Sequence, residues 1–586
     1  MSKLSSELRQ VLPQIIELVN IPLYGARGIL DGGKLLVSAL LEGEANIYTY
    51  DGEKLTKLNK EPVSMVAEPP YGAGRVIIGR DVAKGRELHA LYMIDVSKPL
   101  EEVPLSKDLQ PMRVLSVVDK GSEVFVTGVS PDGIKVFAAE PGAGAREVAT
   151  VPGLGLLTDV GKGHGVGKLF TPSGRTSLLT VNMSTGEVGV KDLGGSVLDA
   201  RFAPDGHAVI AVEGPDMVKL VKASPPDWSL EPLEIPGREL RKYGPTGINY
   251  MGYTPQGELI IVAKKHGRSE VFVDGSRIGT PKGVHSTTFR LANDFVVTHT
   301  SLSTPSRIIR VRPGEGWETV LAAELPGGIK EAIGDSGMEW VSAPDGERVP
   351  TFYLESRNAP KPGPAVVLVH GGPFSEYLDA WNVFAAALAI SGFHVIMPNY
   401  RGSTGYGEGW RLKIIGDPCG AEMEDIIAAA DWAKASGMAD RTYIMGYSYG
   451  GYATMCALTR HPGKFAAGVA GASVVDWEEM YELSDPAFKA FIELLLGKDR
   501  EKWRERSPIN YLDNMRDSLC IVHPQNDSRT PLQPILRFMR EALERGKSFE
   551  AHIAPDMGHA VNTTEDIVKL LLPAVTFLLR QKLGSK

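Results

Sequence analysis

The chain has 586 residues, which is too long for a single hydrophobic core and predicts at least two domains. With 43% hydrophobic and 23% charged residues, it has the composition of a folded globular protein, which excludes a disordered, collagen-like or membrane-embedded chain. The net charge of -8 provides no basic surface, so we expect neither nucleic acid nor a membrane as a partner.

Three cysteines, Cys419, Cys456 and Cys520, are too few for a disulfide framework or a zinc site of the usual ligand count, and we expect no metal and no other cofactor. The N-terminus is charged where a signal peptide needs an apolar stretch, and no apolar run reaches the roughly 18 residues of a spanning helix. These features predict a cytoplasmic protein. The low content of 13 Asn and 7 Gln points to a thermophilic source.

In chain order, the first predicted element is an amphipathic helix over residues 4–20, where apolar side chains recur every three or four positions. Residues 24–327 then consist of short β-branched and aromatic runs separated by turn residues, which is typical of an all-β region. We therefore divide the first part of the chain into an N-terminal helix, residues 1–23, and a β domain, residues 24–327.

A turn motif of the Pro-Asp-Gly type recurs inside this β region, and the spacing of its prolines averages about 41 residues, close to one four-stranded propeller blade. The motif occurs at residues 130–133, 171–174, 203–206 and 254–257. About 300 residues at this period predict a seven-bladed β-propeller. The alternative is that the motif is only a common hairpin turn, but a single sandwich of this length would exceed usual domain sizes.

From residue 328 to 586, apolar strands alternate with helices, which predicts a parallel sheet covered by helices on both faces. The expected strands lie at residues 365–369, 393–397, 442–445, 465–470, 518–522 and 549–553. This pattern predicts a doubly wound α/β domain, and the serine turn described next makes an α/β-hydrolase the expected fold.

The motif Gly446-Tyr447-Ser448-Tyr449-Gly450 lies between the predicted strand 442–445 and a helix. A serine at such a strand-to-helix turn is the nucleophile of α/β hydrolases, and flanking glycines are needed where the backbone crowds. The alternative is a tightly packed turn without chemistry. Because the strand, the turn and the helix occur together, we predict that Ser448 is the nucleophile.

A serine nucleophile needs a histidine base and an orienting carboxylate, and in this fold they follow in the order Ser, Asp, His. His559 follows the last predicted strand and is the expected base. His552 lies inside that strand and His523 closes strand 518–522, so both are expected to be structural. Asp527 follows strand 518–522 and is the expected acid; Asp476 and Asp556 are the rivals.

The developing oxyanion needs backbone donors. The N–H of Tyr449 follows from the serine turn, and the loop His370-Gly371-Gly372-Pro373 after strand 365–369 offers the N–H of Gly372. The alternative is a Gly-Gly-Pro turn with a structural histidine.

The run 370–373, the segment 399–407, the serine turn 446–451 and the run 527–529 together resemble the prolyl oligopeptidase family of serine peptidases, and within it the archaeal acylaminoacyl peptidases. The resemblance covers the whole chain. It implies release of N-acylated residues from short peptides through an acyl-enzyme, with esterase side activity and a propeller that excludes folded proteins. It also implies that the N-terminal helix packs on the hydrolase domain. A homodimer is the expected assembly. A general oligopeptidase or carboxylesterase with the same triad is the alternative function.

An aromatic-rich segment between residues 476 and 496 is expected to form the apolar substrate pocket, with Trp477, Phe488 and Phe491 as lining residues. The spacing of the two phenylalanines also fits a helix core. Arg529 is expected to anchor substrate carbonyls or a propeller carboxylate such as Glu87, and the alternative is a surface arginine. Cys419 and Cys456 lie in neighbouring predicted helices, where a disulfide and two free thiols are both open.

Overall fold

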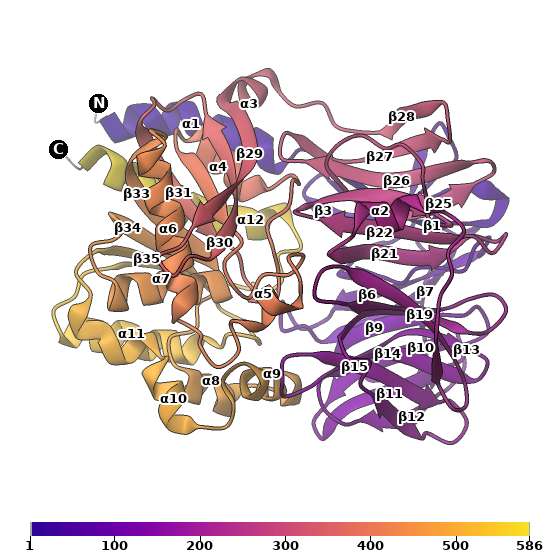
Figure 1. The fold of residues 1–586 in the computed structure, drawn as a ribbon. Helices are drawn as coiled ribbons and strands as arrows, with labels where there is room; N and C mark the ends of the chain where they lie inside the picture. Colours follow the sequence, from indigo (N-terminus) through magenta and orange to yellow (C-terminus); the bar gives the residue numbers. More distant parts are fainter. Residues whose placement is uncertain (1–2, 585–586) are drawn as a thin grey trace.

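The computed structural model describes residues 3–584, and it places a β-propeller beside an α/β domain (Figure 1). The first and last helices of the described chain both belong to the α/β domain, where α1 (Lys3–Val19) lies next to α12 (Thr564–Gly584) (Figure 1). Ile15 and Leu18 of α1 are almost completely buried in the same apolar core as α12. The amphipathic pattern at the start of the sequence therefore belongs to the second domain in space.

Seven antiparallel four-stranded sheets make up the propeller, and each is formed by four strands that follow one another in the chain. The first three blades are β1 (Leu23–Ile29), β2 (Leu35–Leu41), β3 (Glu44–Tyr50), β4 (Leu55–Lys57); β5 (Met65–Val66), β6 (Arg75–Asp81), β7 (His89–Asp95), β8 (Glu102–Pro104); and β9 (Arg113–Asp119), β10 (Val124–Ser130), β11 (Gly133–Ala139), β12 (Ala145–Val151).

The next four blades complete the ring, with a short helix α2 (Glu239–Tyr243) between the fifth and sixth. They are β13 (Gly155–Gly161), β14 (His164–Phe170), β15 (Thr176–Asn182), β16 (Val188–Lys191); β17 (Ser196–Phe202), β18 (Ala208–Glu213), β19 (Val218–Ser224), β20 (Ser229–Pro232); β21 (Gly247–Tyr253), β22 (Leu259–Lys265), β23 (Arg268–Val273), β24 (Ser276–Arg277); and β25 (Val284–Leu291), β26 (Asp294–Ser301), β27 (Thr304–Arg312), β28 (Gly316–Leu321).

The predicted seven-bladed propeller is confirmed, although the four repeated turns are not equivalent. Those at residues 130–133 and 171–174 join the second and third strands of a blade, whereas those at 203–206 and 254–257 join the first and second. Because the turns occupy two different positions within a blade, the spacing between their prolines varies around the length of one blade.

The ring closes without a strand shared between the first and last blades. Side chains of the last blade bond the backbone of β1 instead: Thr287 Oγ1 donates to the Ala26 carbonyl at 2.6 Å, and Ser306 Oγ donates to the Tyr24 carbonyl at 2.8 Å. These contacts satisfy backbone groups of β1, an edge strand that pairs only with β2.

The α/β domain is built on one eight-stranded sheet of order β29-β30-β32-β31-β33-β34-β35-β36. Its strands are β29 (Ile333–Ser342), β30 (Arg348–Ser356), β31 (Gly363–Val369), β32 (His394–Pro398), β33 (Ala439–Tyr447), β34 (Ala467–Gly471), β35 (Ser518–Pro524) and β36 (Glu550–Ala554). The strands from β32 to β36 in this order are parallel, as predicted. Strands β29 and β30 are antiparallel additions that the sequence analysis missed. Much of β29 is exposed, so it lacks the apolar run of a buried strand, whereas β30 is mostly buried.

Helices cover both faces of this sheet. Besides α1 and α12, the helices of this domain are α3 (Gly327–Ala332), α4 (Val383–Ile390), α5 (Glu408–Leu412), α6 (Ala421–Ala435), α7 (Tyr449–Arg460), α8 (Trp477–Leu483), α9 (Pro486–Leu496), α10 (Arg500–Glu505) and α11 (Leu532–Glu544), with a short 3-10 turn at Pro508–Asn514. A second 3-10 turn, at Asp31–Gly33, lies between β1 and β2 of the propeller. One apolar core contains α6 and α7, and the other contains α1, α4 and α12. The predicted α/β-hydrolase fold is confirmed. Within residues 3–584, no helix is both long enough and apolar enough to cross a membrane.

Candidate active site

The turn that carries Ser448 is strained, and it leaves no room for side chains at its glycines. Ser448 lies between β33 and α7 with φ +59° and ψ -122°, a conformation that side chains rarely adopt. A Cβ atom on Gly446 would lie 2.2 Å from the Gly450 carbonyl oxygen, and one on Gly450 would lie 2.0 Å from the Val369 carbonyl oxygen. Glycine is therefore the only residue that fits at both positions, and Ser448 is held at the carboxyl edge of the sheet.

Three side chains expected from the sequence meet at this edge. His559, in the loop after β36, places Nε2 3.0 Å from Ser448 Oγ and Nδ1 2.7 Å from Asp527 Oδ2. The histidine is only 7% exposed and the aspartate 6%. In this arrangement, a neutral imidazole can remove the hydroxyl proton of the serine, while the carboxylate fixes the tautomer of the imidazole.

The loop after β35 holds Asp527 ionised. Its carboxylate accepts hydrogen bonds from the N–H groups of Arg529 (2.9 Å) and Thr530 (2.8 Å) and from Thr530 Oγ1 (2.9 Å). Burial alone would raise the pKa of Asp527, but the charge of His559, the hydrogen bond from His559 and that from the Thr530 N–H outweigh it and lower the pKa to about 2. The sequence analysis missed Thr530, since a threonine three residues after an acid carries no recognisable signal.

The two rival acids have other partners. Asp476 caps the N-terminus of α8 by accepting the N–H of Glu479 at 2.9 Å, and it also pairs with Arg537. Asp556 is exposed and pairs with Lys84 of the propeller at 3.1 Å. Neither carboxylate bonds the imidazole, so the geometry favours Asp527.

The two histidines that were predicted to be structural both lie in strands. His523 is completely buried in β35, and its Nε2 lies 2.8 Å from the Thr530 carbonyl oxygen, so it holds the loop that carries Asp527. His552 lies within β36. The structure adds Tyr447, whose hydroxyl donates to the His559 carbonyl at 2.9 Å and restrains the histidine loop.

The loop predicted to supply an oxyanion donor lies against the serine. A Cβ atom on Gly371 would lie 3.2 Å from Ser448 Cβ, and the next residue, Gly372, has φ +117°, which favours glycine. Tyr449, the other predicted donor, is the first residue of α7. The N–H groups at the start of a helix have no partner within the helix, which leaves that of Tyr449 available to a ligand.

A stack of three rings connects the oxyanion loop to Tyr449. His370 stacks on Tyr400 at 4.4 Å between ring centroids, and Tyr400 stacks on Tyr449 at 6.0 Å. His370 Nε2 also lies 2.8 Å from Ser403 Oγ, and burial lowers the pKa of His370 to about 4, so the ring is neutral at pH 7. The hydroxyl of Tyr449 donates to the buried Glu422 carboxylate at 2.9 Å.

Cys419 and Cys456 form a disulfide with their Cα atoms 6.0 Å apart. Cys419 lies two residues before α6, and Cys456 lies within α7, the helix that begins at Tyr449. The bond therefore ties the segment before Glu422 to the helix that follows the nucleophile.

An aromatic cluster flanks the oxyanion loop. Phe488 and Phe491 of α9 lie 6.0 Å apart between ring centroids, and Phe491 lies 6.5 Å from Phe374, which directly follows the predicted oxyanion loop. All three are half-buried. Phe374 was not singled out from the sequence. An apolar cavity of about 340 Å³ lies beside the core that contains α1, α4 and α12, with Tyr377 and Trp381 in its wall.

Trp477 is a correction to the sequence analysis. It is 1% exposed and packs edge to face on Tyr452 at 5.1 Å, inside the core formed with α6 and α7. A side chain covered on all sides by the core contributes to packing and cannot line a pocket that a substrate reaches.

Charged residues join the propeller to the acid loop. Arg529 Nε donates to Glu87 of the propeller at 2.7 Å, so the propeller carboxylate considered in the sequence analysis is its partner. Arg113 of β9 donates to Ser528 Oγ at 2.8 Å and lies 3.1 Å from Asp485 and 3.5 Å from Glu87. The acid loop is therefore in direct contact with the second and third blades.

Comparisons with known proteins cover both domains. A family model for the acylamino-acid-releasing enzyme-like N-terminal domain matches residues 36–309, and one for the prolyl oligopeptidase family matches residues 380–585. Dipeptidyl aminopeptidase BIII of Pseudoxanthomonas mexicana is 32% identical over 218 residues, which are 36% of this chain and 32% of that protein. The human acylamino-acid-releasing enzyme is 29% identical over 233 residues, 38% of this chain and 32% of its own. The aligned segments thus cover about a third of each relative.

Two solved structures share the complete fold at low sequence identity. A puromycin-hydrolyzing peptidase of Mycobacterium tuberculosis superposes with a TM-score of 0.79 at 19% identity, covering 97% of this chain and 95% of its own. The acylaminoacyl peptidase of Pyrococcus horikoshii superposes with a TM-score of 0.72 at 16% identity and covers 97% of both chains. The common arrangement is a propeller followed by a hydrolase domain.

Proposed function

Because this chain belongs to the prolyl oligopeptidase family of serine peptidases, we propose that it releases N-acylated amino acids from the N-termini of short peptides. The observation that carries the proposal is the hydrogen-bonded series Ser448–His559–Asp527 at the sheet edge that faces the propeller. In this proposal the propeller limits access to peptides small enough to enter between the domains.

The proposed reaction has two halves. Ser448 Oγ attacks the carbonyl carbon of the acylated residue while His559 Nε2 accepts its proton, and the ionised Asp527 stabilises the imidazolium. The N–H groups of Gly372 and Tyr449 donate to the developing oxyanion. The imidazolium then protonates the leaving amine, and a water activated by His559 hydrolyses the acyl-enzyme.

Charge around the site supports a blocked substrate N-terminus. A free α-ammonium group needs a carboxylate without a partner, but Glu87 and Asp485, the carboxylates beside the acid loop, are each paired with arginine. The Arg529 side chain remains 39% exposed and is our proposed anchor for a substrate carbonyl. The cluster of Phe488 and Phe491 is our proposed pocket for the apolar side chain of the released residue.

The test compares acetyl-Phe-p-nitroanilide with Phe-p-nitroanilide. We expect kcat/KM to be at least about tenfold higher for the acetylated substrate, since desolvating an unpaired ammonium costs more than 1 kcal/mol. Ser448→Ala is the control and should abolish turnover of both. A preference for the free amine would contradict acyl specificity. Equal rates on internally cleaved, doubly blocked peptides would indicate a general oligopeptidase, and activity on esters alone would indicate a carboxylesterase.

A further inference from the structure

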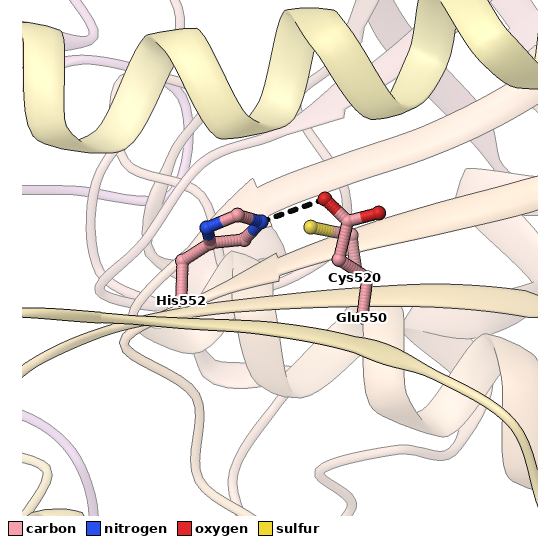
Figure 2. A group of neighbouring side chains, drawn as sticks. All are labelled: Cys520, Glu550 and His552. Atoms are coloured by element: carbon pink, nitrogen blue, oxygen red, sulfur yellow. Dashed lines mark hydrogen bonds and ion pairs between the residues drawn. The ribbon is translucent and has the colours of Figure 1, made fainter.

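A second group of chemically reactive side chains lies behind the candidate active site. Cys520 of β35 pairs in register with Glu550 of the parallel edge strand β36, and His552 lies two residues further along that strand. Alternate residues of a strand share a face, so Glu550 and His552 project to the same side. Figure 2 shows the three side chains converging between the strands and the helix above them.

The donor atoms of this group are close enough to share one ligand. The Cys520 sulfur, a Glu550 carboxylate oxygen and a His552 ring nitrogen all lie within 4.8 Å of one another, and His552 Nε2 is 2.6 Å from Glu550 Oε1. Cys520 is completely buried, whereas the His552 and Glu550 side chains are 40% and 28% exposed. A small ion can therefore reach the group from solvent without opening the core.

We propose that Cys520, Glu550 and His552 form a binding site for a zinc-class divalent cation, with water as the fourth ligand. Thiolate, imidazole and carboxylate are the three protein ligands that Zn²⁺ takes, whereas Mg²⁺ and Ca²⁺ take oxygen alone. Arg580 of α12 pairs with Glu550 Oε2, and the other oxygen, Oε1, is the one that lies beside His552 Nε2 and is offered to the ion together with it. Such an outer partner orients the ligand carboxylate.

Binding replaces the Cys520 thiol proton with the metal, and the proton is released to solvent.

The location of the site gives the cation a mechanical role. Strand β35 leads into the loop that carries Asp527, and β36 leads into the loop that carries His559. A cation bound by Cys520 and His552 crosslinks these two strands at the edge of the sheet, where β36 pairs on one side only. The site goes beyond the proposed peptidase activity and is independent of it.

The experiment titrates the full-length, EDTA-treated protein with Co²⁺ and follows the thiolate-to-cobalt charge-transfer band. Because Cys419 and Cys456 are joined in the disulfide, Cys520 is the only thiol among the three cysteines of the chain. We expect the band to appear with one Co²⁺ per chain and to disappear when Zn²⁺ is added.

The obvious variant, Cys520→Ser, removes the thiolate and should abolish the band. A variant of the half-exposed ligand His552 keeps the test valid even if Cys520→Ser does not fold. We expect His552→Gln to weaken Co²⁺ binding at least about tenfold. His207→Gln is the matched control, because His207 Nδ1 lies 2.6 Å from the Asp205 carboxylate without a cysteine nearby, and it should leave the affinity unchanged. Absence of the band, or equal affinity in His552→Gln and the wild-type protein, would overturn the proposal.

Discussion

At the scale of single residues, the proposed chemistry depends on one aspartate kept ionised in a buried place. Asp527 accepts hydrogen bonds from two backbone N–H groups, the Thr530 hydroxyl and the His559 ring. The charge of His559, its hydrogen bond and the Thr530 N–H hold the pKa of Asp527 at about 2 against the effect of burial. The carboxylate therefore remains charged throughout the pH range in which a histidine can act as a base.

We predict that Asp527→Asn lowers kcat on an acetylated p-nitroanilide by about 10³- to 10⁴-fold, because an amide no longer fixes the His559 tautomer. Steady-state kinetics measure this loss. Asp556→Asn is the control, since Asp556 lies three residues before His559 but is exposed, and we expect a change of less than about threefold. A large loss of kcat in Asp556→Asn would contradict the assignment of Asp527 as the acid.

At the scale of secondary-structure elements, helix α6 supports the serine turn from beneath. Glu422, in the first turn of α6, is completely buried and accepts the Tyr449 hydroxyl as well as the N–H groups of Cys419 and Gly420. Burial outweighs these hydrogen bonds and raises the pKa of Glu422 from 4.5 to about 7. The oxyanion side of the site thus rests on a carboxyl group that titrates near neutrality.

This shift predicts a pH-dependent stability. Because the folded-state pKa of Glu422 is raised, its contribution to stability is fully present below about pH 4 and is lost as the pH rises toward 7. Between pH 4.5 and 8, we expect Glu422→Gln to gain on the order of 2–3 kcal/mol in unfolding free energy relative to wild type. Guanidinium unfolding at the two pH values measures this difference.

Glu424→Gln provides the comparison for this effect. Glu424 lies on the same first turn of α6 but is exposed, and its substitution should leave the pH profile of stability as in the wild type. A Glu422→Gln profile that parallels the wild-type profile would show that Glu422 does not titrate in this range.

At the scale of the whole molecule, the propeller touches both loops that carry the base and the acid. The loop between β6 and β7 approaches the histidine loop so closely that a Cβ atom on Gly85 would lie 2.2 Å from the Gly558 nitrogen. In the same loop, the Lys84 carbonyl accepts a hydrogen bond from Asn526 Nδ2 at 2.8 Å. The position of His559 therefore depends on a contact with a segment more than 400 residues away in the chain.

We predict that Gly85→Ala in the propeller lowers kcat/KM by about 10- to 100-fold, because displacing His559 by about 1 Å is enough for such a loss. Gly142→Ala is the matched control. Gly142 has a similar φ, +78° against +88° for Gly85, but a Cβ atom there would meet nothing within 4 Å. Equal kinetics of the two variants would show that the interdomain contact does not position the histidine.

The sequence by itself determined the elements whose patterns are local. The seven-bladed period, the strand–turn–helix around Ser448 and the alternation of strands and helices depend on side chains a few residues apart, and all three patterns are found in the structure. The chain order of Ser448, Asp527 and His559 also sufficed to choose residues that the structure brings within hydrogen-bond distance.

Only the tertiary structure decided which distant residues meet. Thr530 and Tyr447 around the histidine, Phe374 in the aromatic cluster and the convergence of Cys520 with Glu550 and His552 have no fixed spacing, because parallel strands and packed domains join residues that are far apart in the chain. Trp477 shows the same limit. The sequence pattern of an aromatic residue is the same in a pocket and in a core, and only the burial of Trp477 against α7 places it in the core.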